Sequence, residues 1–192
     1  MMLEHFDQQL LLFLNSVNSP FWDHVMWIIS ATLTWVPLYL AILIALGMKY
    51  KRKFLVLVLM IIIAITLSDQ LSVLIKNSVQ RPRPSHEPAI EGLVHIVKNY
   101  RGGYYGFVSS HASNAFMVAI FSLLLIRKKW FAFCMIFWAL LVGYSRIYLG
   151  VHYPGDVIFG SLLGVVTGWG VFKLYGFIDR KFLKRSTFFS SV

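Results

Sequence analysis

Five stretches of apolar residues run along this chain, and short polar or basic segments separate them. The stretches cover about residues 22–48, 54–75, 109–126, 131–149 and 156–178. A helix rises ~1.5 Å per residue, so about 20 apolar residues cross the ~30 Å hydrocarbon core of a bilayer. The pattern predicts five membrane-spanning helices. The first contains Pro37, so it is expected to kink or to begin as a surface helix.

Residues 3–17, LEHFDQQLLLFLNSV, combine an apolar face with polar positions over a short length. This pattern is typical of a helix that lies in the membrane interface rather than crossing it. The first residues are acidic and lack a basic segment, so a cleaved signal peptide is not expected. The predicted fold is therefore an all-α, polytopic membrane helix bundle of about six helices, with residues 1–192 in one domain.

Composition agrees with a membrane protein. Hydrophobic residues make up 58% of the chain and the mean hydropathy is +0.68, both higher than is usual for a soluble domain. The net charge of +10 would suggest nucleic-acid binding in a soluble protein. Here the basic residues flank apolar runs, where snorkelling and topology explain them, so we expect a bilayer and no nucleic acid as partner. The single cysteine, Cys134, excludes an intramolecular disulfide framework.

Basic residues are distributed unequally between the two sides of the predicted bundle. If each run crosses once, one side carries twelve: Lys49, Lys51, Arg52, Lys53, Arg127, Lys128, Lys129, Lys173, Arg180, Lys181, Lys184 and Arg185. The other side carries six: Lys76, Arg81, Arg83, Lys98, Arg101 and Arg146. The positive-inside rule predicts that the richer side is cytoplasmic, as in a bacterial inner membrane. The long polar loop 77–108 then faces the periplasm or exterior, and the basic tail 180–192 is expected to fray.

Ionisable residues from three distant segments meet on the outward side of this topology. Lys76 and Arg83 follow the second span. His111 begins the third span together with the polar Ser109, and the segment that joins the fourth span to the fifth contains Arg146, His152 and Asp156. Ionisable groups near membrane depth are costly unless they are paired or functional. Because three of these groups are cations, the pattern predicts a site for an anion.

A phosphate ester is the anion that suits these residue types. Its transfer needs positioning and cationic stabilisation of the equatorial oxygens, which Lys76, Arg83 and Arg146 can supply without a metal. Ser109 is well placed as the N-cap of the third span, where the free backbone N–H groups of Ser110 and His111 would face the anion.

A nucleophile and an acid complete the predicted chemistry. His152 and Asp156 are four residues apart, with Pro154 suited to the first turn of the last helix, so the carboxylate can orient the ring. A neutral imidazole oriented in this way can attack phosphorus and form a phosphohistidine. His111 remains to protonate the leaving oxygen.

These segments resemble the motifs of the type 2 phosphatidic acid phosphatase family. KNSVQRPRP resembles its K-x6-R-P motif, VSSH resembles P-S-G-H, and SRIYLGVHYPGD matches S-R-x5-H-x3-D, in the family's order. Val108 and Ser110 replace proline and glycine of the middle motif, so we expect an altered fit rather than lost activity. The resemblance implies His152 as nucleophile with Asp156 as its partner, and His111 as general acid. It also implies phosphate binding by Lys76, Arg83, Ser109, Ser110 and Arg146.

The long loop also contains candidate residues. We expect Arg101, Tyr104 and Tyr105 to overhang the site and select the head group. His86, Glu87, Glu91 and His95 lack the H-E-x-x-H spacing of a zinc site, so neither a metal nor another cofactor is expected.

The resulting prediction is an integral membrane lipid phosphatase that acts on a lipid phosphate or diphosphate. By the family's known activities, undecaprenyl diphosphate ranks first, with lipid A or phosphatidylglycerophosphate next. Two alternatives stay open. A vanadate-dependent haloperoxidase could use the same anion pocket, and a non-enzymatic lipid-phosphate carrier would need only the cations. No oligomeric state is predicted.

Overall fold

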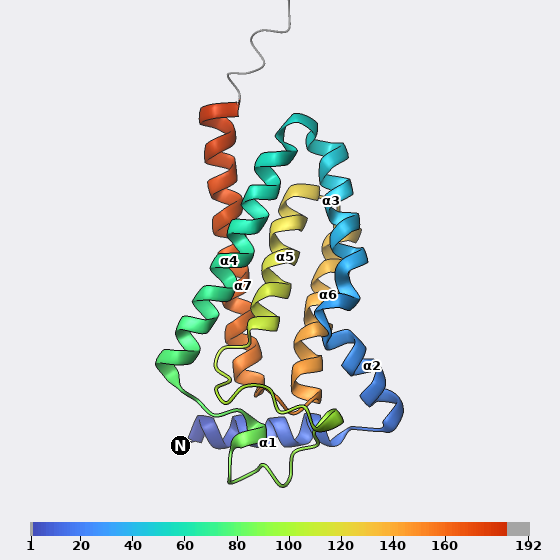
Figure 1. Cartoon of the computed structure of the whole chain (residues 1–192), viewed down its shortest axis with the longest axis vertical. Coiled ribbons are helices and arrows are strands. Elements are labelled where there is room, and N and C mark those ends of the chain that lie inside the picture. Colours follow the sequence, from blue (N-terminus) through green and yellow to red (C-terminus); the bar gives the residue numbers. More distant parts are fainter. Residues whose placement is uncertain (1, 184–192) are drawn as a thin grey trace, which may run out of the picture.

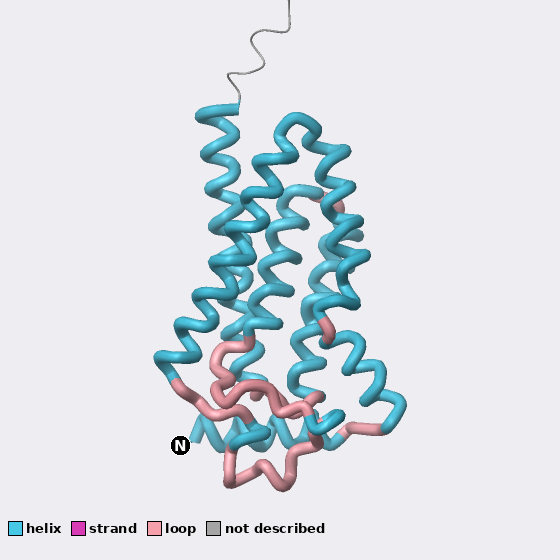
Figure 2. The backbone as a smooth tube through the Cα atoms, viewed as in Figure 1, coloured by secondary structure: helices cyan, strands magenta, loops and turns pink. Residues whose placement is uncertain are grey.

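The computed structural model describes residues 2–183, which form helices joined by loops and turns (Figure 2). No β-strand occurs among these described residues. The α-helices are α1 (Met2–Ser16), α2 (Pro20–Ser30), α3 (Val36–Tyr50), α4 (Phe54–Val79), α5 (Ser110–Ile126), α6 (Lys129–Tyr148) and α7 (Pro154–Ile178). The prediction of an all-α fold is confirmed.

Helices α3 to α7 run side by side along the long axis of the molecule, with α5 in the middle (Figure 1). Helix α1 lies across one end of this bundle. Three described segments are long and apolar enough to cross a membrane: Thr32–Val79, Lys129–Tyr148 and Pro154–Lys181. The first of them folds back at Lys51–Lys53 to form the α3–α4 hairpin. Together with the shorter apolar helix α5, this arrangement confirms a polytopic membrane bundle.

The first predicted span is divided where the sequence suggested a kink. A 3-10 turn, Thr32–Trp35, separates α2 from α3, and Pro37 lies in the first turn of α3. The Thr34 hydroxyl donates to the Ile28 carbonyl at 2.7 Å, and the Trp35 indole donates to the Ile29 carbonyl at 2.7 Å. These bonds join the 3-10 turn to carbonyls in the last turn of α2. Helix α2 therefore slants away from the bundle (Figure 1).

Three glycines allow α7 to pack closely against α5. A Cβ at Gly160 would lie 2.5 Å from the Ser109 carbonyl oxygen, and one at Gly168 would lie 2.8 Å from the Met117 carbonyl oxygen. Gly164 meets backbone in the same way, so this row of small residues permits the close contact between the two helices. The close approach also lets the Ser109 N–H donate to the Asp156 carbonyl at 3.0 Å. It therefore brings the beginnings of α5 and α7 together.

Helix α1 is anchored to the end of the bundle by a buried asparagine. Asn15 is 1% exposed, and its amide nitrogen donates to the Tyr148 carbonyl at 2.7 Å and the His95 carbonyl at 3.0 Å. Its side-chain oxygen accepts from the His95 N–H at 2.7 Å. Leu11, fully buried, packs beside it against the loop and α6. The helix thus lies across the spans, as an interfacial helix would.

The loop and the tail differ slightly from their predicted bounds. Helix α4 extends to Val79, four residues beyond the predicted end of the second span, so Lys76 lies in its last turn and the loop begins at Gln80. Residues 80–109 fold back under the bundle (Figure 1), with Pro82 paired to Tyr105. At the other end, Asp179–Leu183 continue α7 as a π-helical turn. The rest of the predicted tail, 184–192, lies outside the described residues.

Candidate active site

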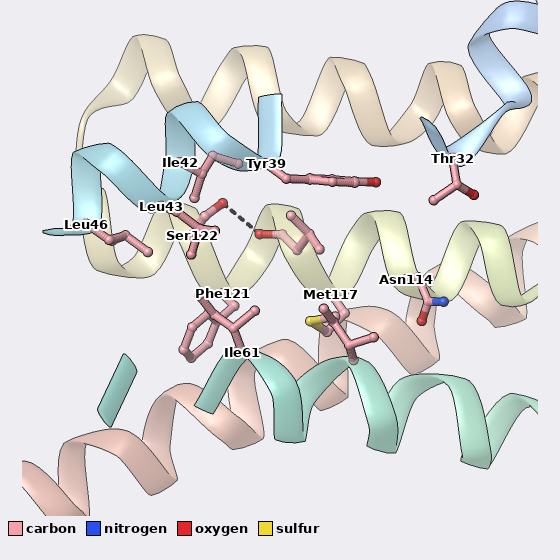
Figure 3. Close-up of a pocket in the computed structure, with 12 residues that line it drawn as sticks. Thr32, Tyr39, Ile42, Leu43, Leu46, Ile61, Asn114, Met117, Phe121 and Ser122 are labelled. Atoms are coloured by element: carbon pink, nitrogen blue, oxygen red, sulfur yellow. Dashed lines mark hydrogen bonds between the residues drawn. The ribbon is translucent and has the colours of Figure 1, made fainter. Parts of the chain in front are cut away.

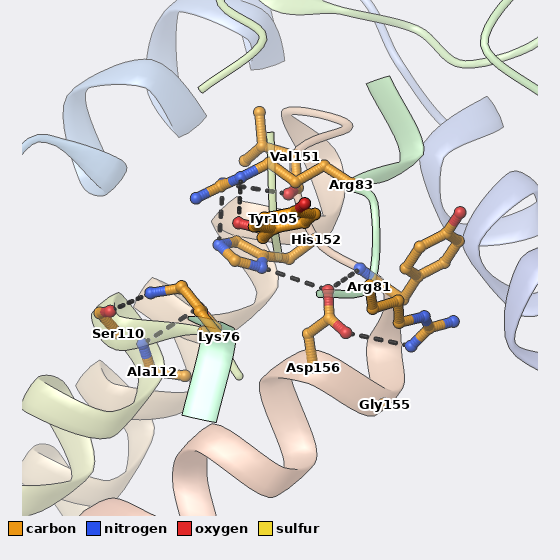
Figure 4. Close-up of polar contacts among 12 residues, drawn as sticks. Lys76, Arg81, Arg83, Tyr105, Ser110, Ala112, Val151, His152, Gly155 and Asp156 are labelled. Carbon is orange, nitrogen blue, oxygen red and sulfur yellow. Dashed lines mark hydrogen bonds and ion pairs between the residues drawn. The ribbon is translucent and has the colours of Figure 1, made fainter. Parts of the chain in front are cut away.

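The end of α4 and the start of α5 meet through Lys76 and Ser110. The ammonium of half-buried Lys76 donates to the Ser110 hydroxyl, which also shares a 2.6 Å hydrogen bond with Ser72 (Figure 4). Ser109 caps α5, its hydroxyl accepting from the Ala112 N–H at 3.4 Å. The serine that stands where the family motif has glycine therefore places its hydroxyl beside the lysine of the first motif.

Arg83 is held in the loop as a largely buried cation. It is 9% exposed, and its guanidinium donates to the carbonyls of Tyr105 and Val151, each at 3.2 Å. A Cβ at Gly102, whose φ is +69°, would lie 2.9 Å from the guanidinium, so glycine is required there on both grounds. Burial, followed by the charge of Arg146, lowers the pKa of Arg83. The two arginines are thus close enough to repel each other.

His152 is buried between Arg83 and Asp156. Its ring is 1% exposed; Nε2 lies 3.0 Å from an Arg83 nitrogen and Nδ1 lies 3.3 Å from Asp156 Oδ2 (Figure 4). A guanidinium has only donors, so Nε2 must be the acceptor in this contact. The single hydrogen of the neutral ring is then on Nδ1, facing the carboxylate. The lone pair of Nε2 points toward the cation.

The charges of the three predicted cations act on His152. Burial lowers the pKa of His152 well below its ordinary value, and the charges of Arg83, Arg146 and Lys76 lower it further. A hydrogen bond with the Gly106 backbone acts in the opposite direction and is the smaller effect. The imidazole is therefore neutral at pH 7, as a nucleophile requires.

Asp156 is fully buried at the start of α7 and is held by several donors. The Tyr153 N–H donates to Oδ2 at 3.1 Å, which caps the helix that Pro154 begins. Its other oxygen, Oδ1, lies 3.0 Å from the guanidinium of Arg81. One carboxylate therefore caps the helix, faces the His152 ring and pairs with an arginine.

Arg81 and Asp7 belong to this cluster, although the sequence did not single them out. Arg81 lies 2.8 Å from Asp7 Oδ2 and stacks over the Tyr153 ring, 3.8 Å from its centroid. Asp7 Oδ1 also accepts from the Gly155 N–H at 2.8 Å. Helix α1 thus reaches the histidine through a chain of ion pairs that runs Asp7, Arg81, Asp156. Arg81 lies inside KNSVQRPRP, but nothing in the spacing of the sequence points to Asp7.

Replacing Asp7 by asparagine should lower turnover more than substrate affinity. The amide keeps the bond to the Gly155 N–H but removes the charge that fixes Arg81, and so loosens the carboxylate behind His152. We expect kcat to fall about tenfold, the equivalent of ~1.4 kcal/mol, with KM changing less. Steady-state kinetics with the exposed Glu4→Gln on the same helix as control check this. Equal kinetics for both variants would remove α1 from the site.

Arg146 and His111 form the other wall. Arg146 is 3% exposed; its guanidinium donates to the Ser30 hydroxyl and lies 5.7 Å from the centroid of the Tyr100 ring. With His111 it lines a cavity of about 220 Å³. Its Nε is buried without a hydrogen-bond partner within residues 2–183, so one donor is available for an anion. Neither Ser30 nor Tyr100 could be assigned to this arginine from sequence spacing.

The polar chamber around His111 adjoins an apolar one. A cavity of about 250 Å³ is lined by Asp69, Ser110 and His111, and a second, of about 260 Å³, lies between α3, α4 and α5 (Figure 3). Asn114 lines both cavities, and its side-chain oxygen is buried without a partner in the described part of the chain. The two spaces together offer a polar end for an anion and an apolar end for a hydrocarbon chain.

The predicted head-group residues of the loop occupy different positions. Tyr105 holds Arg83 through its carbonyl, whereas the side chain of Tyr104 is exposed. The guanidinium of Arg101 donates to the Ser85 carbonyl at 2.8 Å and lies 3.3 Å from Glu91. Arg101 is therefore bonded within the loop, and a role in head-group selection stays a prediction.

The chain is similar to one protein family and to several named phosphatases. The model of the PAP2 superfamily matches residues 53–180. A lipid A 4'-phosphatase of Bacteroides thetaiotaomicron is 42% identical over 95% of this chain and 81% of its own, and one of Porphyromonas gingivalis is 37% identical over 94% and 77%. The crystal structure of Aquifex aeolicus LpxE has a TM-score of 0.69 at 28% identity, covering 86% of this chain and 93% of its own.

A PAP2 type phosphatidylglycerolphosphate phosphatase of Bacillus subtilis has the same fold. Its TM-score is 0.73 at 24% identity, and the match covers 94% of this chain and 89% of that one. The apolar bundle and the relatives define an integral membrane phosphatase. The chain belongs to the PAP2 superfamily, which confirms the family resemblance of the three motifs.

Proposed function

We propose that this membrane lipid phosphatase removes the 4'-phosphate of a lipid A-type glycolipid through a phosphohistidine on His152. The observation that carries the mechanism is the buried, neutral imidazole whose Nδ1 faces Asp156 and whose Nε2 faces a cation. The substrate is supported by the two lipid A 4'-phosphatases, which match this chain over more than nine-tenths of its length. Their similarity reverses the ranking from motifs alone, in which undecaprenyl diphosphate came first.

In the first step, Nε2 of His152 attacks phosphorus while the bond from phosphorus to the sugar oxygen breaks. In the free enzyme the guanidinium of Arg83 donates to Nε2. When the substrate binds, this guanidinium donates to a phosphate oxygen instead, which frees the lone pair of Nε2. Lys76 and Arg146 would hold other phosphate oxygens, and the N–H groups in the first turn of α5 would donate to the same phosphate. Asp156 stabilises the positive charge that develops on the ring, because Nδ1 already faces it.

His111 has the proton-transfer role. It donates a proton to the leaving sugar oxygen, and the negative charge of the bound phosphate favours the protonated ring that this requires. In the second step His111 takes a proton from water, which attacks the phosphohistidine and releases inorganic phosphate. The chain's own cations supply the charge stabilisation in both steps, so no metal enters the proposed mechanism.

The lipid part of the substrate is proposed to extend into the apolar cavity beside the site. Asn114 stands at the junction between that cavity and the polar chamber of His111. The loop containing Arg101 and Tyr104 would contact the head group from outside. By the positive-inside rule this end faces the periplasm, which places the substrate in the outward leaflet of the inner membrane.

A prenyl diphosphate is the second candidate substrate. A putative undecaprenyl-diphosphatase of Escherichia coli is 27% identical over 86% of this chain. The same cations could hold a diphosphate, and a prenyl chain could occupy the same apolar cavity. The haloperoxidase and carrier alternatives receive less support, because the curated relatives above are named as phosphatases.

Phosphate release from a panel of lipids tests the proposal. Purified protein is given lipid A, undecaprenyl diphosphate, phosphatidylglycerophosphate and phosphatidic acid, each with and without excess EDTA. We expect the highest kcat/KM with lipid A, mass spectrometry showing loss of the 4'-phosphate, and the same rates in EDTA. A higher kcat/KM with undecaprenyl diphosphate would favour the second candidate. A requirement for added divalent metal would contradict the metal-free mechanism.

A further inference from the structure

A second polar cavity lies at the end of the bundle opposite the catalytic residues. Its volume is about 500 Å³, and it is formed where the ends of α3, α5 and α7 meet (Figure 1). Its lining includes two tyrosines and four cations: Lys49, Tyr50, Arg127, Lys173, Tyr175 and Arg180. None of these residues takes part in the chemistry derived above. The cavity therefore requires a separate explanation.

The hydroxyl of Tyr175 is the strongest indication of a ligand. Tyr175 is 5% exposed, lines this cavity, and its hydroxyl has no hydrogen-bond partner within residues 2–183. Tyr50 packs edge-on against the same ring at 6.2 Å between centroids, but its own hydroxyl donates to the Leu125 carbonyl at 2.9 Å. A buried hydroxyl without a partner is costly. An acceptor that enters the cavity would satisfy it.

The charges around Tyr175 select an anionic acceptor. Lys49 donates to the carbonyls of Leu125 and Ile126, at 2.7 and 3.0 Å, and Arg127 donates through Nε to the Leu124 carbonyl at 3.2 Å. These bonds fix both cations beside the cavity while using only part of their donors, since a lysine has three N–H groups and an arginine five.

The carboxylate on the lining does not cancel these charges. Asp179 Oδ1 lies 2.5 Å from the ammonium of Lys53, so its negative charge is already balanced. The four cations of the lining therefore leave the cavity with a positive field. Phosphate oxygens are the acceptors that match several such cations together with a hydroxyl donor.

We propose that this cavity binds the phosphate of an anionic phospholipid in the leaflet opposite the active site. A lipid fits better than free phosphate because exposed apolar residues on α7 are neighbours in sequence of the lining residues. Leu174 is 42% exposed and Phe177 is 52% exposed, and each is adjacent in sequence to a lining residue. Acyl chains would lie along them while the head group enters. Basic pockets between helices on the cytoplasmic side of membrane proteins bind anionic head groups in this way.

Lipid binding to the full-length protein tests this inference. Delipidated protein in neutral detergent is titrated with phosphatidylglycerol, phosphatidylcholine or inorganic phosphate, and melting temperature and native mass spectrometry are recorded. Phosphatidylglycerol is expected to bind and to raise the melting temperature by several degrees, with weaker effects of the zwitterionic lipid and none of free phosphate at the same concentration. An equal effect of inorganic phosphate would overturn the assignment to a lipid.

Two variants and a matched control locate the binding. Tyr175→Phe removes only the hydroxyl and Arg127→Gln removes one charge, and each should raise the half-saturating phosphatidylglycerol concentration about tenfold. Lys128→Gln removes the neighbouring exposed cation, which does not line the cavity, and should leave it unchanged. Wild-type affinity in both cavity variants, or an equal loss in Lys128→Gln, would refute the site. Because none of these positions lies near His152, the result is independent of the substrate proposal.

Discussion

Substituting His152 by alanine is expected to reduce phosphate release by at least about a thousandfold. In the mechanism proposed above the ring is the nucleophile, so its removal eliminates the covalent step rather than weakening binding. The cations remain, so KM should change much less than kcat. Steady-state phosphate release from lipid A, with binding measured separately, checks both parts of the expectation.

The control for His152→Ala is His24→Ala, which removes an exposed histidine of α2. Rapid quenching of wild-type enzyme in base should also trap a phosphohistidine, because that bond survives base and breaks in acid. His152→Gln, which better preserves the buried volume, distinguishes loss of chemistry from loss of fold. If His152→Ala retains substantial turnover, or if phosphate is trapped on another residue, His152 is not the nucleophile.

Much of the site was visible in the sequence because its residues lie at fixed spacings within short segments. A four-residue separation at a helix start brings His152 and Asp156 into contact, and Ser109 caps α5 as its position before an apolar run predicted. The spans were equally accessible, since their length and hydropathy follow from bilayer thickness.

The remainder depends on contacts between segments with no fixed spacing. Asp7 and Gly155 are 148 residues apart, and Arg146 and Ser30 are 116 apart, so only the folded bundle brings each pair together. Local propensity also left the end of α4 uncertain, because Lys76 looks like the end of an apolar run although the helix continues to Val79. The sequence therefore did not predict the ion pairs of Arg81 with Asp7 in α1 and with Asp156 in α7.

Asp156→Asn should lower kcat by about a hundredfold or more, with KM and folding less affected. The amide has nearly the same shape, and its oxygen can still accept from the Tyr153 N–H, so the cap of α7 is retained. The same oxygen position also faces Nδ1, so the amide still contacts the ring but has no charge with which to stabilise it during phosphoryl transfer. Its NH₂ group then lies at the position of Oδ1, beside Arg81, which has only donors to offer it. Measurement of kcat and KM, with the melting temperature as a check on folding, gives the result.

A double-mutant cycle between Arg81 and Asp156 distinguishes a specific loss of the carboxylate's function from a general loss of structure. Arg81 lies 3.0 Å from Oδ1, so in the wild type its removal leaves a buried carboxylate without that partner, which is costly. In the Asp156→Asn background the same Arg81→Met substitution removes a partner that no longer has a charge to balance. We therefore expect Arg81→Met to lower kcat clearly in the wild type and little in Asp156→Asn. Equal effects in both backgrounds would show that Arg81 acts independently of the carboxylate, and the chain of ion pairs from α1 to His152 would then have no catalytic role.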